Sequence, residues 1–308
     1  MSETKRIAWD GVSFDIPANW ELAVYKFLKK GVTRVEIEDE VAVRLEAEWV
    51  RPKRKLQMDH ILARYERRSK KLTSLADDRK PIKQLPDGWV ATHYTFAETL
   101  PKRNKRGLMV VKHSLVTAFY LDPDSKLFCF VLLHFLPEDK EKPAETTRLV
   151  AANFRHYVGE PLVPWQLYDI AFELPQDFHL ENTLFDIGRK LMIFRWGGRR
   201  FYLLHFSCTD MFLKEGMNIP EWVAAHLNDM RCVPGGTFYI GDRGDIQWRR
   251  RRRHFVAHRD QLARWCFKFR AEWHIDEEKR QLIAWVFNYR RDSDLRVIPE
   301  SLRFGRTF

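Results

Sequence analysis

Residues 14–20 of this chain read Phe-Asp-Ile-Pro-Ala-Asn-Trp, and residues 172–178 read Phe-Glu-Leu-Pro-Gln-Asp-Phe. Each segment runs aromatic, acid, branched aliphatic and proline in the same order, and each ends on an aromatic residue. The two copies begin 158 residues apart, 172 minus 14, in a chain of 308 residues. That length is enough for two domains of about 150 residues each. The repeat therefore predicts two tandem modules, residues 1–160 and 161–308.

The hydrophobic pattern around the first copy indicates a sheet and two helices. Alternation with a period of two predicts strands at residues 12–16 and 41–49. Further strands are predicted at 32–37, 89–96, 110–120 and 127–135, the last because residues 127–133 are almost wholly apolar. In the strand 41–49, the polar members Arg44, Glu46 and Glu48 fall on the side that we expect to face solvent. The period changes at residues 58–72 and predicts a helix of about four turns with a basic outer side. A second helix is expected from Pro143 to a cap at Gly159.

The second copy repeats this order. A hairpin with a Gly-Gly turn is predicted at residues 190–208, a helix begins at residues 218–220, and strands follow at 265–273 and 282–289. A basic insertion at residues 241–259 interrupts the copy, and no final helix follows, so we expect an extended tail. The fold class predicted is α+β: two tandem modules, each an antiparallel β-sheet packed by one or two helices.

This arrangement resembles the PsbP-like α/β/α sandwich superfamily. The matching positions are Phe14, Ile16, Pro17 and Trp20 in the first copy, and Phe172, Leu174, Pro175 and Phe178 in the second. The superfamily includes an extrinsic subunit of photosystem II, an import factor that binds the GTPase Ran, and DcrB-like chaperones of bacterial secretion effectors. The resemblance implies a protein-binding or accessory role. The basic insertion and the missing final helix depart from the pattern, so no particular member's function is carried over.

Basic side chains are the candidate binding residues. The formal net charge of +11 suits an anionic partner, and it equally suits a protein with many solvated arginines. One cluster places an aromatic ring next to guanidinium groups, which can bind phosphate or stack on bases. It consists of Trp248, Arg249, Arg250, Arg251, Arg252 and Arg253. A second basic loop contains Lys102, Arg103, Lys105 and Arg106. Solvated loop charge remains the alternative interpretation of both clusters.

Motifs for catalysis and for cofactors are not found in the sequence. There is no Gly-x-Ser-x-Gly elbow, no Walker-type Gly-Lys-Ser/Thr and no Gly-x-Gly-x-x-Gly. The pairs His254 with His258 and His205 with Cys208 lack the further ligands of a zinc site. We therefore expect no metal, no cofactor and no enzymatic activity. A minor alternative is an enzyme whose site lies between the two copies.

Cellular location is predicted from the cysteines and from the apolar runs. The four cysteines form no Cys-x-x-Cys pair, which favours reduced core thiols in a cytoplasmic protein. No run of about 18 apolar residues suggests a membrane span, and the polar first residues suggest neither a signal peptide nor a transit peptide. We expect a non-catalytic adaptor, chaperone or assembly subunit that binds an acidic protein surface. The alternative is a nucleic-acid-binding accessory protein that uses Arg249–Arg253. The oligomeric state is left open.

Overall fold

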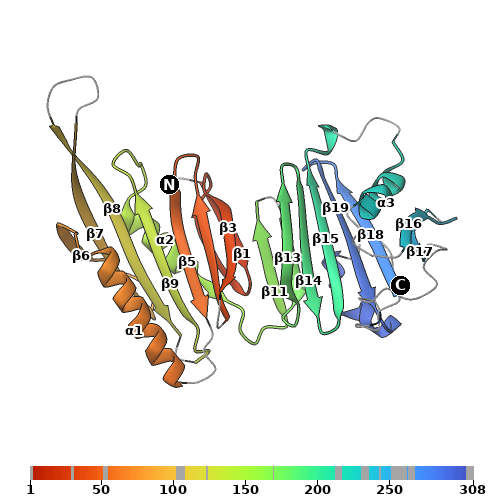
Figure 1. Cartoon of the computed structure of the whole chain (residues 1–308), viewed down its shortest axis with the longest axis horizontal. Coiled ribbons are helices and arrows are strands. Elements are labelled where there is room, and N and C mark those ends of the chain that lie inside the picture. The colour runs from red at the N-terminus through yellow and green to blue at the C-terminus, as the bar shows by residue number, and fades with distance from the viewer. Residues whose placement is uncertain are drawn as a thin grey trace. The chain divides into compact units, whose positions relative to one another are not determined.

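The computed structural model describes residues 3–28, 31–50, 55–101, 108–122, 124–168, 170–211, 217–229, 236–242, 244–250, 262 and 268–302. Within these residues, nineteen strands form four antiparallel sheets, against three α-helices (Figure 1). The predicted α+β class, with helices packing each sheet, is therefore wrong, and the fold is β-rich. The prediction failed because several strands lack clean alternation and because the second predicted helix is much shorter than its apolar pattern suggested.

Two compact units divide the chain. The first consists of Met1–Val158 with Pro164–Ala171, and the second of Gly159–Val163 with Phe172–Phe308. The stretch Pro164–Ala171 thus belongs to the first unit although it follows that unit's last helix in sequence. Each unit is described by itself below.

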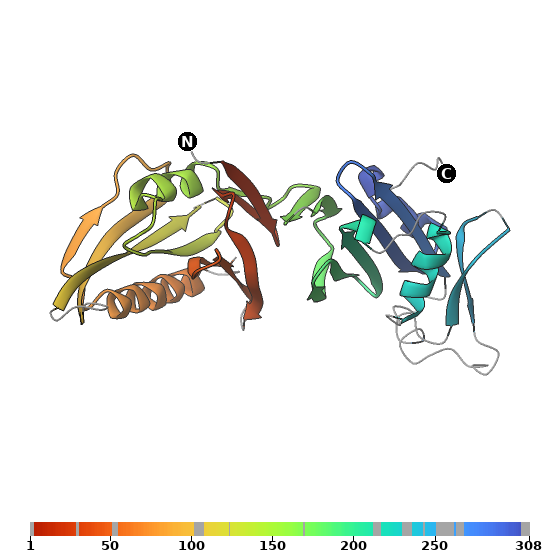
Figure 2. The same ribbon diagram turned by 90° about the horizontal axis from the view of Figure 1, so that it is seen from above.

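A seven-stranded sheet is the centre of the first unit, with the order β3-β4-β5-β9-β8-β7-β6. Its strands are β3 (Glu21–Leu28), β4 (Val32–Glu38), β5 (Val43–Val50), β6 (Asp78–Pro81), β7 (Trp89–Pro101), β8 (Leu108–Leu121) and β9 (Phe128–Phe135). The predicted hairpin of β4 and β5 is confirmed, with Val35 opposite Ala47. Helix α1 (Lys55–Leu72), also as predicted, covers one face, and α2 (Pro143–Ala152) lies on the other face (Figure 2).

The first sequence motif lies in a smaller sheet with the order β10-β2-β1-β11-β12. Its strands are β1 (Thr4–Trp9), β2 (Val12–Pro17), β10 (Arg155–His156), β11 (Leu162–Leu167) and β12 (Ile170–Pro175). Phe14, Ile16 and Trp20 are almost completely buried, as expected of core residues. The expected helix cap at Gly159 is wrong, because α2 ends earlier and its C-cap is Asn153, whose side-chain amide donates to the Leu149 carbonyl.

The second unit contains a five-stranded sheet in the order β13-β14-β15-β19-β18. Its strands are β13 (His179–Asp186), β14 (Arg189–Trp196), β15 (Arg199–Ser207), β18 (Lys268–Asp276) and β19 (Gln281–Tyr289). Helix α3 (Ile219–Asp229) and a separate hairpin, β16 (Gly236–Ile240) with β17 (Ile246–Arg250), pack into one apolar cluster with this sheet. The short 3-10 turn η2 (Thr209–Met211) follows β15.

The segment after β19 differs from the expected extended tail. It forms two 3-10 turns, η3 (Asp292–Val297) and η4 (Glu300–Leu302). The indole nitrogen of Trp285 donates a hydrogen bond to the Leu302 carbonyl oxygen at 2.6 Å, and both residues are buried. These turns cover aromatic core residues that would otherwise face water.

Candidate functional site: helix α1 and the ionic network beneath it

Helix α1 has an apolar underside and a basic outer side. Its inward residues Ile61, Leu62 and Tyr65 pack with the sheet, and the Tyr65 ring lies 5.0 Å from that of Phe128. The cations on its exposed outer side, which form no ion pair with any described residue, are Arg64, Arg67, Lys70 and Lys71. Lys70 and Lys71 lie in the last turn, where cations interact favourably with the helix dipole. We call these four residues the basic face of α1.

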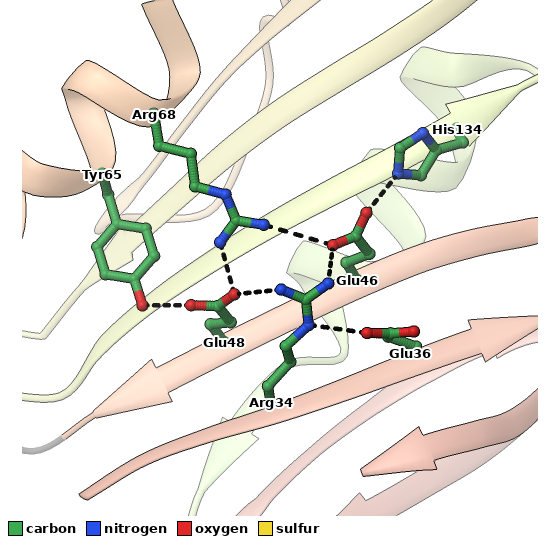
Figure 3. A network of polar contacts seen from close by, with 7 residues as sticks. All are labelled: Arg34, Glu36, Glu46, Glu48, Tyr65, Arg68 and His134. Carbon is green, nitrogen blue, oxygen red and sulfur yellow. Dashed lines mark hydrogen bonds and ion pairs between the residues drawn. The ribbon is translucent and has the colours of Figure 1, made fainter. Parts of the chain in front are cut away.

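Beneath α1, Arg34 of β4 binds three glutamates (Figure 3). Its Nε lies 2.9 Å from Glu36 Oε1, its Nη1 3.0 Å from Glu48 Oε1, and its Nη2 2.6 Å from Glu46 Oε2. Strand pairing produces this arrangement, because Arg34 lies directly opposite Glu48 and Glu36 directly opposite Glu46. The guanidinium group thus uses its planar fork of donors to bridge several carboxylates.

Three further side chains complete this ionic network. Arg68 of α1 reaches Glu48 Oε1 at 2.5 Å and Glu46 Oε2 at 3.4 Å. The Tyr65 hydroxyl donates to Glu48 Oε2 at 2.5 Å, and His134 Nε2 of β9 lies 3.1 Å from Glu46 Oε1. The Glu48 side chain is only 2% exposed. The network therefore fastens α1 to three strands through polar bonds as well as through apolar packing.

Burial and hydrogen bonding shift the pKa values of three groups in the network. The hydrogen bond with His134 is the largest influence on Glu46, and together with nearby arginine charge it lowers the pKa of that carboxyl despite burial. Burial is the largest influence on Glu48, but the hydrogen bonds from Tyr65 and Arg68 outweigh it and lower its pKa too. Burial and the bond to Glu48 raise the pKa of Tyr65. At neutral pH Glu46 and Glu48 are therefore ionised, and they serve as charged acceptors for the arginines around them.

The expectation that Arg44, Glu46 and Glu48 face solvent is wrong. Arg44 and Glu48 are buried, and Glu46 is 18% exposed, because α1 and neighbouring side chains cover this side of β5. Arg44 forms separate ion pairs, at 2.7 Å with Asp39 and at 2.5 Å with Asp139. Period-two alternation distinguishes two faces of a strand but does not say which of them a helix will cover.

The sheet of the second unit has a similar strand order, β13-β14-β15-β19 against β3-β4-β5-β9, but the face that its helix covers is apolar. There Leu191 lies opposite Leu204 and Ile193 opposite Tyr202 on β14 and β15, where the first unit pairs Arg34 with Glu48 and Glu36 with Glu46. These four residues pack with Val223 and other residues of α3 in the apolar cluster. In the described part of the second unit, α3 therefore packs on its sheet through an apolar cluster, whereas α1 of the first unit also contacts an ionic network.

A cavity of about 620 Å³ opens beside the C-terminal half of α1. Ser69 and Lys70 of the helix line it, together with Thr73 just after the helix and the segment 76–79 at the start of β6. Tyr94 of β7 and Phe119 of β8 contribute aromatic rings to the lining. The cavity therefore combines an aromatic surface with charged edges.

The described part of the predicted arginine cluster lies in the hairpin of β16 and β17. Trp248 packs against Phe269 with the ring centroids 4.6 Å apart, and it belongs to the margin of the second unit's core. The Arg249 guanidinium lies 5.2 Å from the ring of Tyr239. The backbone of Arg250 ends β17, paired with Gly236. Trp248 and the adjacent Arg249 therefore do not share one exposed surface.

The remaining predicted binding residues fall outside the described residues. They are Arg251, Arg252 and Arg253, together with Lys102, Arg103, Lys105 and Arg106. Pro101 is paired with Leu108, so the second group connects the ends of β7 and β8. Of the paired metal candidates, His254 and His258 are also outside, while His205 is buried and Cys208 is exposed. Cys129 is a buried thiol whose pKa is raised by burial, as expected of a core thiol, whereas Cys208 is not in the core.

Comparison with models of known protein families gave no match, and a search of curated protein sequences gave none either. The resemblance to PsbP-like modules therefore stays a prediction. In the residues that the structure describes, no group of three or more metal-binding side chains is found. No helix among them is long and apolar enough to cross a membrane.

The sequence pattern did indicate the basic outer side of α1, but it did not single it out as a site. The consecutive arginines of the insertion were the stronger candidate for a binding site, because they are adjacent in sequence. The sequence feature that indicated the network was a set of three acids in β4 and β5. In an isolated strand these side chains would be exposed to solvent; they are Glu36, Glu46 and Glu48. Their meeting with Arg68 requires the helix to pack on that face, and the sequence gives no direct sign of that docking.

Proposed function

We propose that this chain is a non-catalytic, cytoplasmic protein that binds an acidic surface of another protein, as an adaptor, chaperone or assembly subunit. The observation that supports this is the basic face of α1, four exposed cations without an ion pair to any described residue. Exposed charge of one sign steers the approach of an oppositely charged partner and suppresses wrong ones. The predicted basic loop, residues 102–106, and the arginines 249–253 are further candidates for contact.

The division of charge within the first unit favours a surface role for these cations. The buried acids Glu46 and Glu48 are already neutralised by Arg34 and Arg68. Exposed surface pairs in this unit, such as Lys80 with Asp78 at 2.8 Å, account for further acids. The cations of the basic face are therefore not required for internal ion pairing, and they remain available to a partner.

An acidic protein fits the basic face better than nucleic acid does. Binding of single strands commonly uses exposed aromatic rings on which bases stack, and the described outer side of α1 carries none. Trp248, the aromatic residue of the arginine cluster, packs onto Phe269. Nucleic acid remains an outcome of the test.

Charge reversal on α1 tests the proposal. The double variant Arg64→Glu/Arg67→Glu should reduce partner capture from native cells at low salt by about tenfold, a change of 1.4 kcal/mol in binding free energy. Both side chains are exposed, so the fold should be retained. A matched control reverses two exposed lysines of the same unit that lie away from α1, Lys83→Glu/Lys140→Glu. Capture is read by quantitative mass spectrometry, with and without nuclease.

Three results distinguish the possibilities. One stoichiometric protein that survives nuclease and is lost only with the α1 variant supports the proposal. Nuclease-sensitive material with a steep salt dependence would show that the partner is nucleic acid. Equal loss with both double variants would show that net charge, and not the basic face, governs binding.

A further inference from the structure

The end of α1 combines exposed apolar residues with positive charge. Leu72, 43% exposed, ends the helix, and Leu75, 86% exposed, follows it. Residues 64–80 contain seven Lys and Arg against three Asp and Glu. Isolated exposed leucines are ordinary in proteins, but these two lie next to the segment that borders the cavity beside α1.

Two of the three acids that line the cavity already have partners in the described structure. Asp77 accepts the Ala97 amide at 2.6 Å, and Asp78 binds Lys80 at 2.8 Å. Glu66, one helical turn before Lys70, is the remaining acid on the cavity wall. Lys70 and Arg79, on opposite sides of the cavity, form no ion pair with any residue in the described part of the chain. A negatively charged ligand would therefore meet cations on both sides of the cavity.

The cavity has the dimensions of a site for a side chain or a small ligand, since such pockets measure about 300–1,000 Å³. Tyr94 and Phe119 offer aromatic surface inside it. The apolar surface continues outside it, on Leu72 and Leu75, where an enclosed small molecule would not reach. A chain that crosses the opening and inserts one side chain uses all of these features.

We propose that the cavity between α1 and β6 is the anchor pocket for an acidic segment of the partner protein, which inserts one aromatic or large aliphatic side chain. The inference rests on the proposed function, because it specifies how the partner of α1 is recognised. The anchor packs against Tyr94 and Phe119, while acidic residues beside it meet Lys70 and Arg79. An interface of this kind concentrates its affinity in a central apolar anchor surrounded by polar contacts.

Defined peptides on the full-length chain test the pocket. The probes are a short fluorescein-labelled Glu/Ser peptide with one central Phe, the same peptide with Ala, and a Lys/Ser peptide with Phe. Fluorescence anisotropy should show that the acidic Phe peptide binds about tenfold tighter than the acidic Ala peptide, the preference expected for burying a large apolar side chain. The Lys/Ser peptide should not bind.

Two variants locate the anchor. Ala76→Trp fills the cavity without changing charge, and it should abolish the preference for Phe over Ala while weaker, salt-dependent binding of both acidic peptides remains. Tyr94→Ala removes an aromatic residue from the cavity lining, and it should reduce the preference about threefold. The Tyr94 variant provides the answer if Ala76→Trp does not fold.

The outcomes separate this inference from the proposed function. Equal binding of the two acidic peptides, or an unchanged preference in either folded variant, overturns the anchor pocket. The proposed function survives that result if Arg64→Glu/Arg67→Glu still weakens acidic peptide binding, and it fails if that variant has no effect. Tighter binding of a single-stranded oligonucleotide, displacing the peptide, would show that the partner class is wrong.

Discussion

Glu48 is the residue on which the polar contacts of the first unit converge. It is almost completely buried, and it binds Arg34, Arg68 and Tyr65 at once. A buried carboxylate is tolerated only when its charge and its lone pairs are satisfied. Loss of this one side chain therefore leaves two guanidinium groups and a phenol without their shared acceptor.

We predict that Glu48→Gln lowers the free energy of unfolding by about 2–3 kcal/mol at neutral pH, measured by urea denaturation. Removing one partner of a buried ion pair costs about 3–5 kcal/mol, and the partial exposure of Arg34 and Arg68 reduces that figure. The control Glu36→Gln removes an acid that is 18% exposed and bonded to Arg34 alone, and should cost less than about 1 kcal/mol.

The pH dependence provides a second measure of this prediction. Folding lowers the pKa values of Glu46 and Glu48 below the ordinary value of 4.5. A carboxyl group with a lowered folded pKa adds stability that is fully present above 4.5 and is lost as the pH falls towards the folded value. Stability should therefore decrease on acidification below that point, and less steeply in Glu48→Gln. An identical acid dependence in both proteins would contradict the role assigned to Glu48.

Among the elements, the hairpin of β16 and β17 depends on a glycine. A Cβ atom at Gly236 would lie 2.2 Å from the Trp248 indole, far inside contact distance. The ring occupies that space because it packs on Phe269 at the margin of the core. Trp248 therefore has a structural role whatever the neighbouring arginines bind.

We predict that Gly236→Ala destabilises the second unit by about 1–3 kcal/mol, because the indole must shift from its packed position. The measurement is urea unfolding of the single variant and of Gly236→Ala/Trp248→Ala against Trp248→Ala alone. In the background without the indole, the alanine should cost little, since the clash has gone. Equal costs in the two backgrounds would show that the glycine serves some other purpose.

Long elements with a strong apolar pattern could be predicted from the sequence, and several short strands could not, among them β1, the middle strand of its sheet. Strand β9 is an almost continuous apolar run and helices α1 and α3 carry helical spacing, and these three were predicted, as were β7 and β8. Strand β3 was missed because Tyr25 and Phe27 interrupt its pattern at a sheet edge, and β6 because it is short and charged. The basic side of α1 was visible in the sequence, whereas the network depends on the docking of α1 onto β4 and β5.

At the scale of the whole molecule, the two units interleave in sequence. Strand β11 follows α2 in the chain but pairs with β1, with Ala8 opposite Gln166. Trp165 lies 5.2 Å from Trp9, and the Tyr168 hydroxyl donates to the Leu22 carbonyl at 2.5 Å. The first unit is therefore incomplete when the chain is cut after its last helix.

We predict that a fragment of residues 1–171 unfolds cooperatively, and that a fragment of residues 1–158 is less stable by about 3 kcal/mol or more. The shorter fragment loses the burial of Trp165 and exposes the pairing edge of β1. Thermal unfolding followed by circular dichroism should place the two midpoints about 10 °C apart. Coincident midpoints would show that Pro164–Ala171 contributes nothing to the first unit.

The contrast between the ionic face under α1 and the apolar face under α3 also bears on how such a chain can change over evolutionary time. A stepwise route from Leu, Ile and Tyr to Arg and Glu passes through proteins that bury one charge without its partner. Each such intermediate is destabilised by about 2–3 kcal/mol, since Arg34 and Arg68 are partly exposed, and that is still a large fraction of the stability of an ordinary domain. Single mutations are therefore selected against in either direction. Exchange of one kind of face for the other therefore requires coordinated replacement of several residues.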